Sequence, residues 1–479
     1  MKLVPRAMSQ ETFFGVAAGG GGAGAVGELR AAQALKNRLL VRGVVVEARL
    51  TGHAHADLAE RAYGLLAEME RHAADEVQRV LVYPAVGAWA WRAYRSLMGH
   101  AAKAIRGDAG DAVRGTAGGT AGHMAEGVGR GGGKGGGKDT AVEDPGRLGA
   151  LALAVAIRSG VACAVQLPVS DGTIMLPSLG RVTLPDVRGV VDVGVRPDGD
   201  GARLDVAGTR LRVSASDEVD GDGWEPLHRL PAPAGEGLVI DDLDPYRWPA
   251  AHASPVYEGV EPRLTDEQRR VWRVCMRDAW QVLGAHHRTV AEEVISGIRV
   301  FTPITAPARG ENSASSRETF GAVALSEPRN GLRLAATLAH EMQHAKLTAL
   351  IDQVELTLPE AGGRHYAPWR DDPRPVYGLL QGSYAYLGVA RFWGRQRRVE
   401  RGEPAFRAEV EFARWREGAY LVSETLMNSG GLNERGERFV REMRRTLERL
   451  LSEPVGRAAA AQARLEADQH LEAWVRRNP

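Results

Sequence analysis

Two histidines four residues apart, His340 and His344, form an H-E-x-x-H pattern with Glu341 inside the stretch "LRLAATLAHEMQHAKLTALI". On a helix, residues four apart lie one turn from each other on the same face, so both imidazoles can bind one divalent metal ion. In zinc peptidases with this pattern, the glutamate activates a metal-bound water. The alternative is a pair of helix histidines that make ordinary hydrogen bonds.

The flanking sequence is apolar enough for a buried helix. We expect this helix to begin at Asn330 or Gly331 and to end near Ile351. A second long helix is predicted to follow, within "PVYGLLQGSYAYLGVARFWGRQRR".

The third metal ligand separates hydrolysis from other chemistry. The elongated zinc-peptidase pattern places another histidine six positions after His344, where this chain has Leu350. The second helix has no carboxylate before Glu400, and Gln381 lies near its start. Further candidates in the connecting loop and on a later helix are His365, Asp371, Asp372 and Glu424. The incomplete pattern makes peptide hydrolysis the weaker interpretation.

Two other segments could bind an anion. In the loop "RHYAPWRDDPRP", Arg370 and Arg374 could each hold a carboxylate through two parallel hydrogen bonds. From spacing alone, an Asp–Arg network that stabilises the loop explains these residues equally well. In "NSASSRETFGAVALS", Ser315, Ser316 and Arg317 could hold an anion or form a polar turn before a strand.

The remaining histidine pairs, His53–His55 and His286–His287, lie at expected loop or helix-end positions. They are more typical of solvated surface than of a second metal site.

Composition excludes several classes of protein. The 479 residues are enough for two or three packed units, and the net charge of +1 gives no electrostatic reason to expect nucleic acid or membrane binding. Cys163 and Cys275 are too few and too far apart for a disulfide framework. The chain shows neither a signal-peptide core nor an apolar run of membrane-spanning length, so we expect a cytoplasmic protein.

The expected fold is α+β and mainly helical, with a small antiparallel β unit in the middle and the H-E-x-x-H helix in the C-terminal half. A match to the phosphate-binding pattern G-x-x-x-x-G-K at Gly132–Lys138 is followed by Asp139 instead of Ser or Thr, so we attribute it to glycine-rich composition. The expected segments are an N-terminal helical region (1–106), a Gly-rich flexible insertion (107–146), a helix plus a small β-rich region (147–250), an H-E-x-x-H metal-binding catalytic region (251–455) and a charged tail with few tertiary anchors (456–479).

The stretch "AHEMQHAKLTALID", followed by "APWRDDPRPVYGLLQGSYAYLGVARFW", resembles the HExxH-motif domain of bacterial gene clusters for ribosomally made, modified peptides. The likeness extends to "YPAVGAWAWR", "VSDGTIMLPSLGR", "IDDLDPYR" and "SASSRETFGAVALS", and covers residues 11–450 apart from the Gly-rich insertion. Members of this group are described as α-ketoglutarate-dependent HExxH-type peptide β-hydroxylases.

The resemblance implies Fe(II) on His340 and His344, with α-ketoglutarate and oxygen as co-substrates. It further implies Gln381 as the third metal ligand, Arg370 or Arg374 as the partner of the distal carboxylate of α-ketoglutarate, and an orienting role for Glu341. The implied partners are a precursor peptide substrate and a radical-SAM maturase from the same gene cluster.

Two alternative functions stay open at this point. One is a zinc metallopeptidase with Glu341 as general base, and the other is a non-catalytic peptide-binding partner of a maturase.

Overall fold

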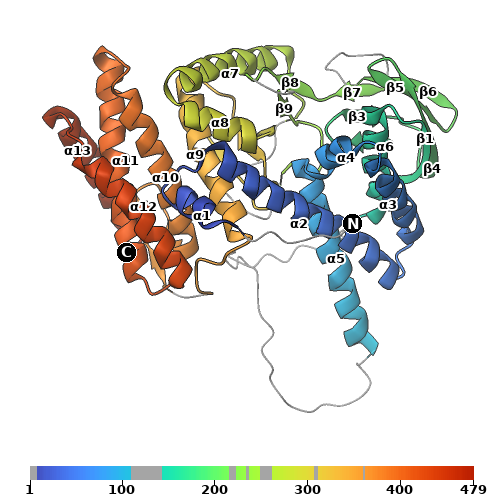
Figure 1. Cartoon of the computed structure of the whole chain (residues 1–479), viewed down its shortest axis with the longest axis horizontal. Helices are drawn as coiled ribbons and strands as arrows, with labels where there is room; N and C mark the ends of the chain where they lie inside the picture. The colour runs from blue at the N-terminus through green and yellow to red at the C-terminus, as the bar shows by residue number, and fades with distance from the viewer. Residues whose placement is uncertain are drawn as a thin grey trace. The chain divides into compact units, whose positions relative to one another are not determined.

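The structure is a computed structural model that describes residues 8–108, 143–214, 223–233, 237–248, 262–306, 311–359 and 362–479. Most of the predicted Gly-rich insertion, including Gly132–Lys138, lies outside these residues. The predicted mainly helical α+β fold is confirmed (Figure 1). Within the described residues, no helix combines the length and the apolar character needed to cross a membrane.

The chain forms two compact units, each assembled from separate segments. Unit 1 contains Met1–Leu35, His228–Asp242 and Val260–Pro479, and unit 2 contains Lys36–Leu227 and Leu243–Gly259. The units therefore do not follow the consecutive segments expected from the sequence. Helix α2 (Gly22–Leu50) continues from one unit into the other.

Unit 2 consists of helices packed on small antiparallel sheets. Its helices are the second part of α2, α3 (Ala56–Glu70), α4 (Ala74–Leu81), α5 (Pro84–Asp108), the 3-10 helix η1 (Pro145–Arg147) and α6 (Leu148–Ser159). Helix α6 is apolar around most of its circumference and is buried against α3, α4 and strand β1. It forms the core of this unit.

The strands of unit 2 make two antiparallel sheets, as the sequence predicted for this part of the chain. The larger has the order β1 (Cys163–Val169), β4 (Gly189–Asp198), β5 (Gly201–Val206) and β6 (Thr209–Ser214). The smaller contains β2 (Thr173–Leu176), β3 (Gly180–Thr183) and β7 (Trp224–Pro226).

Unit 1 contains a mixed sheet with the order β11 (Ser313–Ala314), β12 (Ala322–Leu325), β10 (Val300–Pro303), β9 (Leu238–Ile240) and β8 (His228–Leu230). Strand β10 pairs in parallel with both β9 and β12. The sequence assigned residues up to 240 to an antiparallel unit, and the parallel pairing of β9 corrects that assignment. A strand of three buried residues carries no pattern that distinguishes the two kinds of pairing.

The helices of unit 1 are α1 (Gln10–Ala17), the start of α2, α7 (Asp266–His286), α8 (Arg288–Gly297), α9 (Gly331–Ile351), α10 (Val376–Gln396), α11 (Gly402–Asn428), α12 (Glu434–Ser452) and α13 (Arg457–Arg477). Helix α9 packs against α7 and α10, and α10 packs against α11 (Figure 1). A short β13–β14 pairing (Arg364–His365 with Arg374–Pro375) closes the loop between α9 and α10.

The expectation that residues 456–479 have few tertiary anchors is wrong. These residues form helix α13, which buries Ala459 and Ala463 against α11. Glu466 of α13 also accepts hydrogen bonds from Arg407 and Arg414 of α11. Small residues and ion pairs hold this helix in place, so its polar sequence gave little indication of packing.

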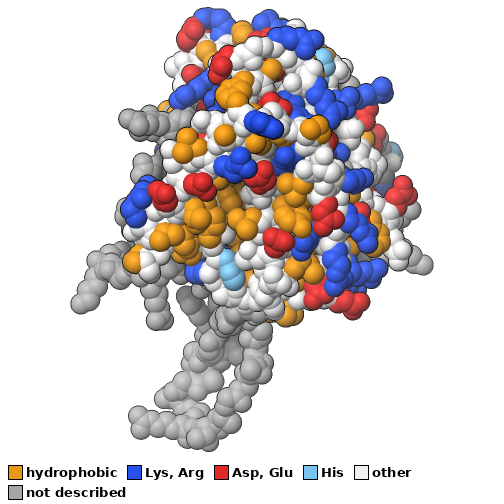
Figure 2. Space-filling model, turned by 90° about the vertical axis from the view of Figure 1, so that its left-hand side faces the viewer, with side chains coloured by type: hydrophobic (Ala, Val, Ile, Leu, Met, Phe, Trp, Pro, Cys, Tyr) orange, Lys and Arg blue, Asp and Glu red, His pale blue; other side chains and the backbone are white. Residues whose placement is uncertain are grey.

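Basic and acidic side chains are interspersed over the face shown in Figure 2.

Candidate metal centre

Helix α9 positions the H-E-x-x-H residues, and its predicted bounds are confirmed. Asn330 caps the helix by accepting a hydrogen bond from the backbone N–H of Arg333 at 2.9 Å. Leu334, Leu338 and Met342 bury one side of the helix in the core of unit 1. This packing fixes the helix about its axis and directs the two histidines toward α10.

His340 and His344 turn the same ring nitrogen toward each other. Their Nε2 atoms are 3.1 Å apart, and the rings meet edge to face at 74°. Two imidazole nitrogens at the usual ~2.0–2.1 Å from one metal ion would subtend about 100° at this separation, which falls between tetrahedral and octahedral angles. The pair therefore fits a shared metal ion.

His340 is neutral at physiological pH. Burial, and secondly the proximity of His344, lower its pKa to about 4, although Glu341 acts in the opposite direction. Only the neutral imidazole can donate a lone pair to a metal, so this environment keeps the ring ready to bind one.

Gln381 lies on the other side of the His344 ring from the expected metal position. Its Oε1 is 3.1 Å from His344 Nδ1, and its Nε2 donates to the hydroxyl of Tyr377 at 3.2 Å. Because an amide oxygen only accepts, Nδ1 carries the proton and Nε2 keeps the lone pair. In this geometry Gln381 is placed to orient His344, and its role as the third metal ligand stays a prediction.

Glu341 is held rigidly beside the pair. Its side chain is 1% exposed, and its two oxygens accept hydrogen bonds of 2.6 Å from the hydroxyls of Ser313 and Ser315. One carboxylate oxygen lies 3.9 Å from His340 Nε2. The serines come from β11 and the residues after it, so the sheet of unit 1 fixes the carboxylate.

The rest of the "NSASSRETF" segment makes a polar turn and does not gather around an anion site. The hydroxyl of Ser316 accepts from the N–H of Glu318, and Arg317 donates to Asp352 at 2.6 Å. Of Ser315, Ser316 and Arg317, Ser315 alone contacts Glu341 beside the candidate metal centre. Ser313 was not anticipated.

The other candidate ligands have different partners. Asp371 pairs with Arg477, Glu424 pairs with Arg444, and the His365 ring contacts the carbonyl of Gly362. Within the described residues, no third His, Cys, Asp or Glu forms a cluster of donor atoms with His340 and His344 inside 4.8 Å. The described residues thus offer two imidazole nitrogens at this position.

The two arginines of the connecting loop share one carboxylate. Arg370 Nε donates to one oxygen of Asp372 at 2.9 Å, and Arg374 donates to the other at 3.0 Å. Partial burial alone would raise the pKa of Asp372, but hydrogen bonds and charge from Arg374 and Arg370 hold it below its ordinary value. These contacts form the Asp–Arg network that stabilises the loop. Residue spacing alone explained the arginines equally well by such a network or by ligand binding. Each guanidinium keeps further N–H donors for a second anion.

Tyr386, Trp369 and Trp415 form an aromatic wall next to the candidate metal centre, and the sequence pattern did not predict it. Tyr386 lies edge-on to His340 with ring centroids 5.2 Å apart. It also stacks on Trp369 at 4.7 Å and contacts Trp415 at 4.2 Å. Burial raises the pKa of Tyr386, and Arg370 is near enough to influence it. The wall thus connects the arginine loop with the histidine pair.

The two other histidine pairs are not simple surface residues. His287 is buried, stacks on Phe392 at 4.1 Å and approaches Gln396 Oε1 at 2.8 Å, which corrects the expectation for this residue. In unit 2, His55 Nδ1 lies 2.9 Å from the carboxylate of Asp144. His53, His55 and Asp144 each place a donor atom within 4.8 Å of the others.

Comparison with protein-family models and with curated proteins gives no match for this chain. The resemblance to HExxH-motif peptide hydroxylases therefore stands on the motifs quoted above.

Proposed function

We propose that this protein is an Fe(II)/α-ketoglutarate-dependent hydroxylase that acts on the β-carbon of a residue in a ribosomally made precursor peptide. The observation that carries the proposal is the convergence of two imidazole nitrogens, with no third His, Cys, Asp or Glu donor grouped with them in the described residues. A metal held in this way keeps positions free for a chelating keto acid and for oxygen.

His340 and His344 would hold the iron, and imidazole is a ligand type that suits iron. When bound, iron(II) supplies the oxidative chemistry in which oxygen, α-ketoglutarate and a C–H bond become succinate, carbon dioxide and an alcohol. Gln381 would keep the His344 Nε2 lone pair aimed at the metal, because its Oε1 accepts the hydrogen bond from the Nδ1–H of the ring.

Arg370 and Arg374 are the proposed partners of the distal carboxylate of α-ketoglutarate. They are already oriented by Asp372 and retain free donors. Loss of one bidentate contact costs about 2–3 kcal/mol, so Arg370→Ala or Arg374→Ala should raise the half-saturating α-ketoglutarate concentration.

Tyr386, Trp369 and Trp415 pack on the His340 side of the pair, where they would limit the access of water. Exclusion of water strengthens the electrostatic contacts inside the site and suppresses side reactions. Glu341 is fixed by its serines and is suited to orient a ligand or the substrate.

A zinc metallopeptidase is the second candidate. It is favoured by the Glu341 carboxylate, which lies 3.9 Å from His340 Nε2, near the place required of a general base. Against it, a catalytic zinc normally has three protein ligands, and this pair lacks the third among the described residues.

The test is the mass of the product formed from a precursor peptide encoded beside the gene. A gain of one oxygen atom with one succinate per turnover supports the hydroxylase, and two fragments support the peptidase. An unchanged peptide that still binds the protein supports a non-catalytic role.

A further inference from the structure

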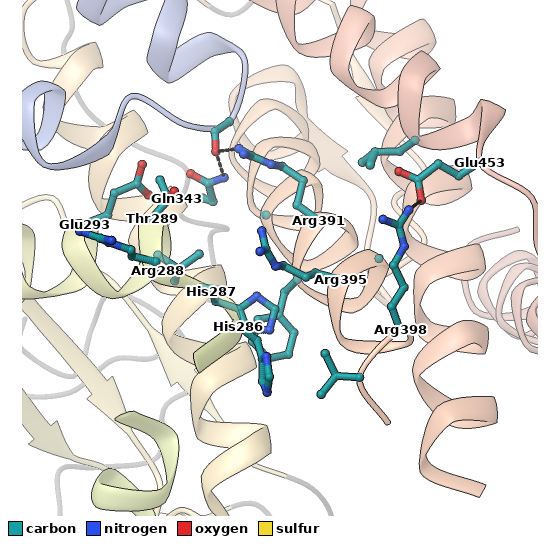
Figure 3. A pocket seen from close by; sticks show the side chains of 18 residues that line it. His286, His287, Arg288, Thr289, Glu293, Gln343, Arg391, Arg395, Arg398 and Glu453 are labelled. Atoms are coloured by element: carbon teal, nitrogen blue, oxygen red, sulfur yellow. Dashed lines mark hydrogen bonds and ion pairs between the residues drawn. The ribbon is translucent and has the colours of Figure 1, made fainter. Parts of the chain in front are cut away.

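A cavity of about 620 Å³ lies in unit 1, separate from the histidine pair. It is bounded by α8, α9, α10 and the end of α12, and Figure 3 shows its lining. On α9, Ala339 and Gln343 line this cavity, whereas their neighbours His340 and His344 form the metal centre. A ligand in the cavity would therefore leave the metal centre open.

The cavity is strongly basic along one helix. Arg391 and Arg395 are four residues apart on one face of α10, and Arg398 lies in the turn that follows the end of the helix at Gln396. Like charges at this spacing destabilise a helix, and a concave surface concentrates their field. Figure 3 shows Arg391 and Arg395 extending into the space between α10 and α8, while Arg398 turns to Glu453.

The acidic residues of the lining do not neutralise this charge. Glu293 is buried and pairs with Lys346 at 2.7 Å, and it also accepts the N–H of Gly22 at 3.0 Å. Glu453 accepts from Arg397 and Arg398, each at 2.8 Å. In the described part of the chain, no hydrogen bond or ion pair is found for the Arg395 guanidinium, while Arg391 contacts the carbonyl of Gly19.

We propose that this cavity binds an acidic segment of the peptide substrate through Arg391 and Arg395. Four residues along a helix advance about 6 Å, so the two arginines are spaced by that distance along α10. Alternate side chains of an extended peptide are about 6.6 Å apart. Two acidic residues separated by one position therefore match the two guanidinium groups.

That the ligand is a peptide rests on the proposed function, whereas the preference for carboxylates rests on the cavity itself. A segment bound here, on a different face of α9 from the histidines, anchors the substrate away from the residue that reacts. Such an anchor raises the local concentration of the reacting segment at the metal.

The experiment measures binding without turnover, by fluorescence anisotropy of a labelled peptide with glutamates at alternate positions. A peptide with glutamines in their place is the ligand control. Arg395→Gln and Arg395→Glu are the test variants, and Arg401→Glu is the matched control because Arg401 is exposed and does not line the cavity.

We expect the glutamate peptide to bind more tightly than the glutamine peptide and to weaken as salt rises. Arg395→Gln should weaken binding about threefold and Arg395→Glu more than about tenfold, while Arg401→Glu changes it little. His344→Ala should bind the peptide normally, so a failure of the hydroxylase proposal would not affect this result.

Three results would overturn the proposal. The first is equal affinity for both peptides, and the second is an equal effect of Arg395→Glu and Arg401→Glu on that affinity. The third is displacement of the bound peptide by inorganic pyrophosphate at concentrations below the dissociation constant of the peptide. The last would assign the cavity to a phosphate ligand.

Discussion

The ring of His344 is held between two partners, with Gln381 Oε1 at 3.1 Å from its Nδ1 and the His340 Nε2 at 3.1 Å from its Nε2. One nitrogen is thus committed to a protein acceptor and the other to the position expected for a metal. Binding of a metal ion by His344 would require this division of roles within one ring.

Gln381 should affect metal affinity without being required for metal binding. Gln381→Leu removes the acceptor for the Nδ1 proton, and loss of such a partner typically weakens metal binding about 10–100-fold. Gln381→Glu keeps an acceptor and should bind iron(II) at least as tightly as the wild type. Competition with a chelator measures both affinities. Tyr377→Phe is the control, because it alters the amide nitrogen contact alone. Complete loss of metal from the Gln381→Leu variant would show that Gln381 is a direct metal ligand.

His340→Ala and His344→Ala should each abolish stoichiometric metal retention while the protein stays folded. Neither side chain belongs to the apolar core, and the His340 side chain is 21% exposed. Elemental analysis after gel filtration gives the metal content, and circular dichroism reports the fold. His365→Ala is the control, since His365 contacts Gly362. Full iron retention by both test variants would disprove the site.

The serines that hold Glu341 should matter for stability. In the double variant Ser313→Ala/Ser315→Ala, a carboxylate that is 1% exposed loses both hydrogen-bond donors. Hydrogen bonds to a charged group contribute about 1.5–3 kcal/mol each, so unfolding free energy in urea should fall by about 3 kcal/mol or more. Adding Glu341→Gln should recover part of this loss. A double variant as stable as the wild type would show that water replaces the serines.

The sequence predicted the parts of the site that lie on one helix. The bounds of α9 followed from its apolar periodicity and from Asn330 as its cap, and the histidine spacing placed both rings on one face. Contacts across the chain could not be predicted in this way. Ser313 and Gln381 reach α9 from 28 residues before Glu341 and 37 residues after His344, and only tertiary packing sets their orientation.

The aromatic wall escaped prediction for a related reason. Tyr386, Trp369 and Trp415 come from three separate segments of the chain. In addition, a tyrosine within an apolar helix is ordinarily assigned to the hydrophobic core. Trp369 can lie against α10 because Gly382 has no side chain, since a Cβ there would collide with the indole. A glycine inside a helix indicates a close approach but not the residue that approaches.

His228 should make the protein less stable in mild acid. Burial, and secondly the charges of Arg263, Arg269 and Arg273, lower its pKa to about 3, against 6.5 when unfolded. Between these values the unfolded chain binds a proton that the folded chain does not, so stability is complete above pH 6.5 and falls as pH decreases. The slope for one such histidine is at most about 1.4 kcal/mol per pH unit.

His228→Phe should flatten this part of the stability profile between pH 6.5 and pH 4.5, as measured by urea unfolding. At pH 7.5, the difference in unfolding free energy between variant and wild type reports the change in packing alone, so it serves as the internal reference. A variant whose stability falls with pH as steeply as that of the wild type would show that His228 is protonated in the folded state.

The most direct test of the central claim is turnover of the precursor peptide by the iron(II)-loaded protein with oxygen and α-ketoglutarate each present or withheld. We predict hydroxylated peptide and succinate in equal amounts, with no product when either co-substrate is absent. The His344→Ala variant should give neither product. Cleavage of the peptide by zinc-loaded protein, without oxygen or keto acid, would contradict the account.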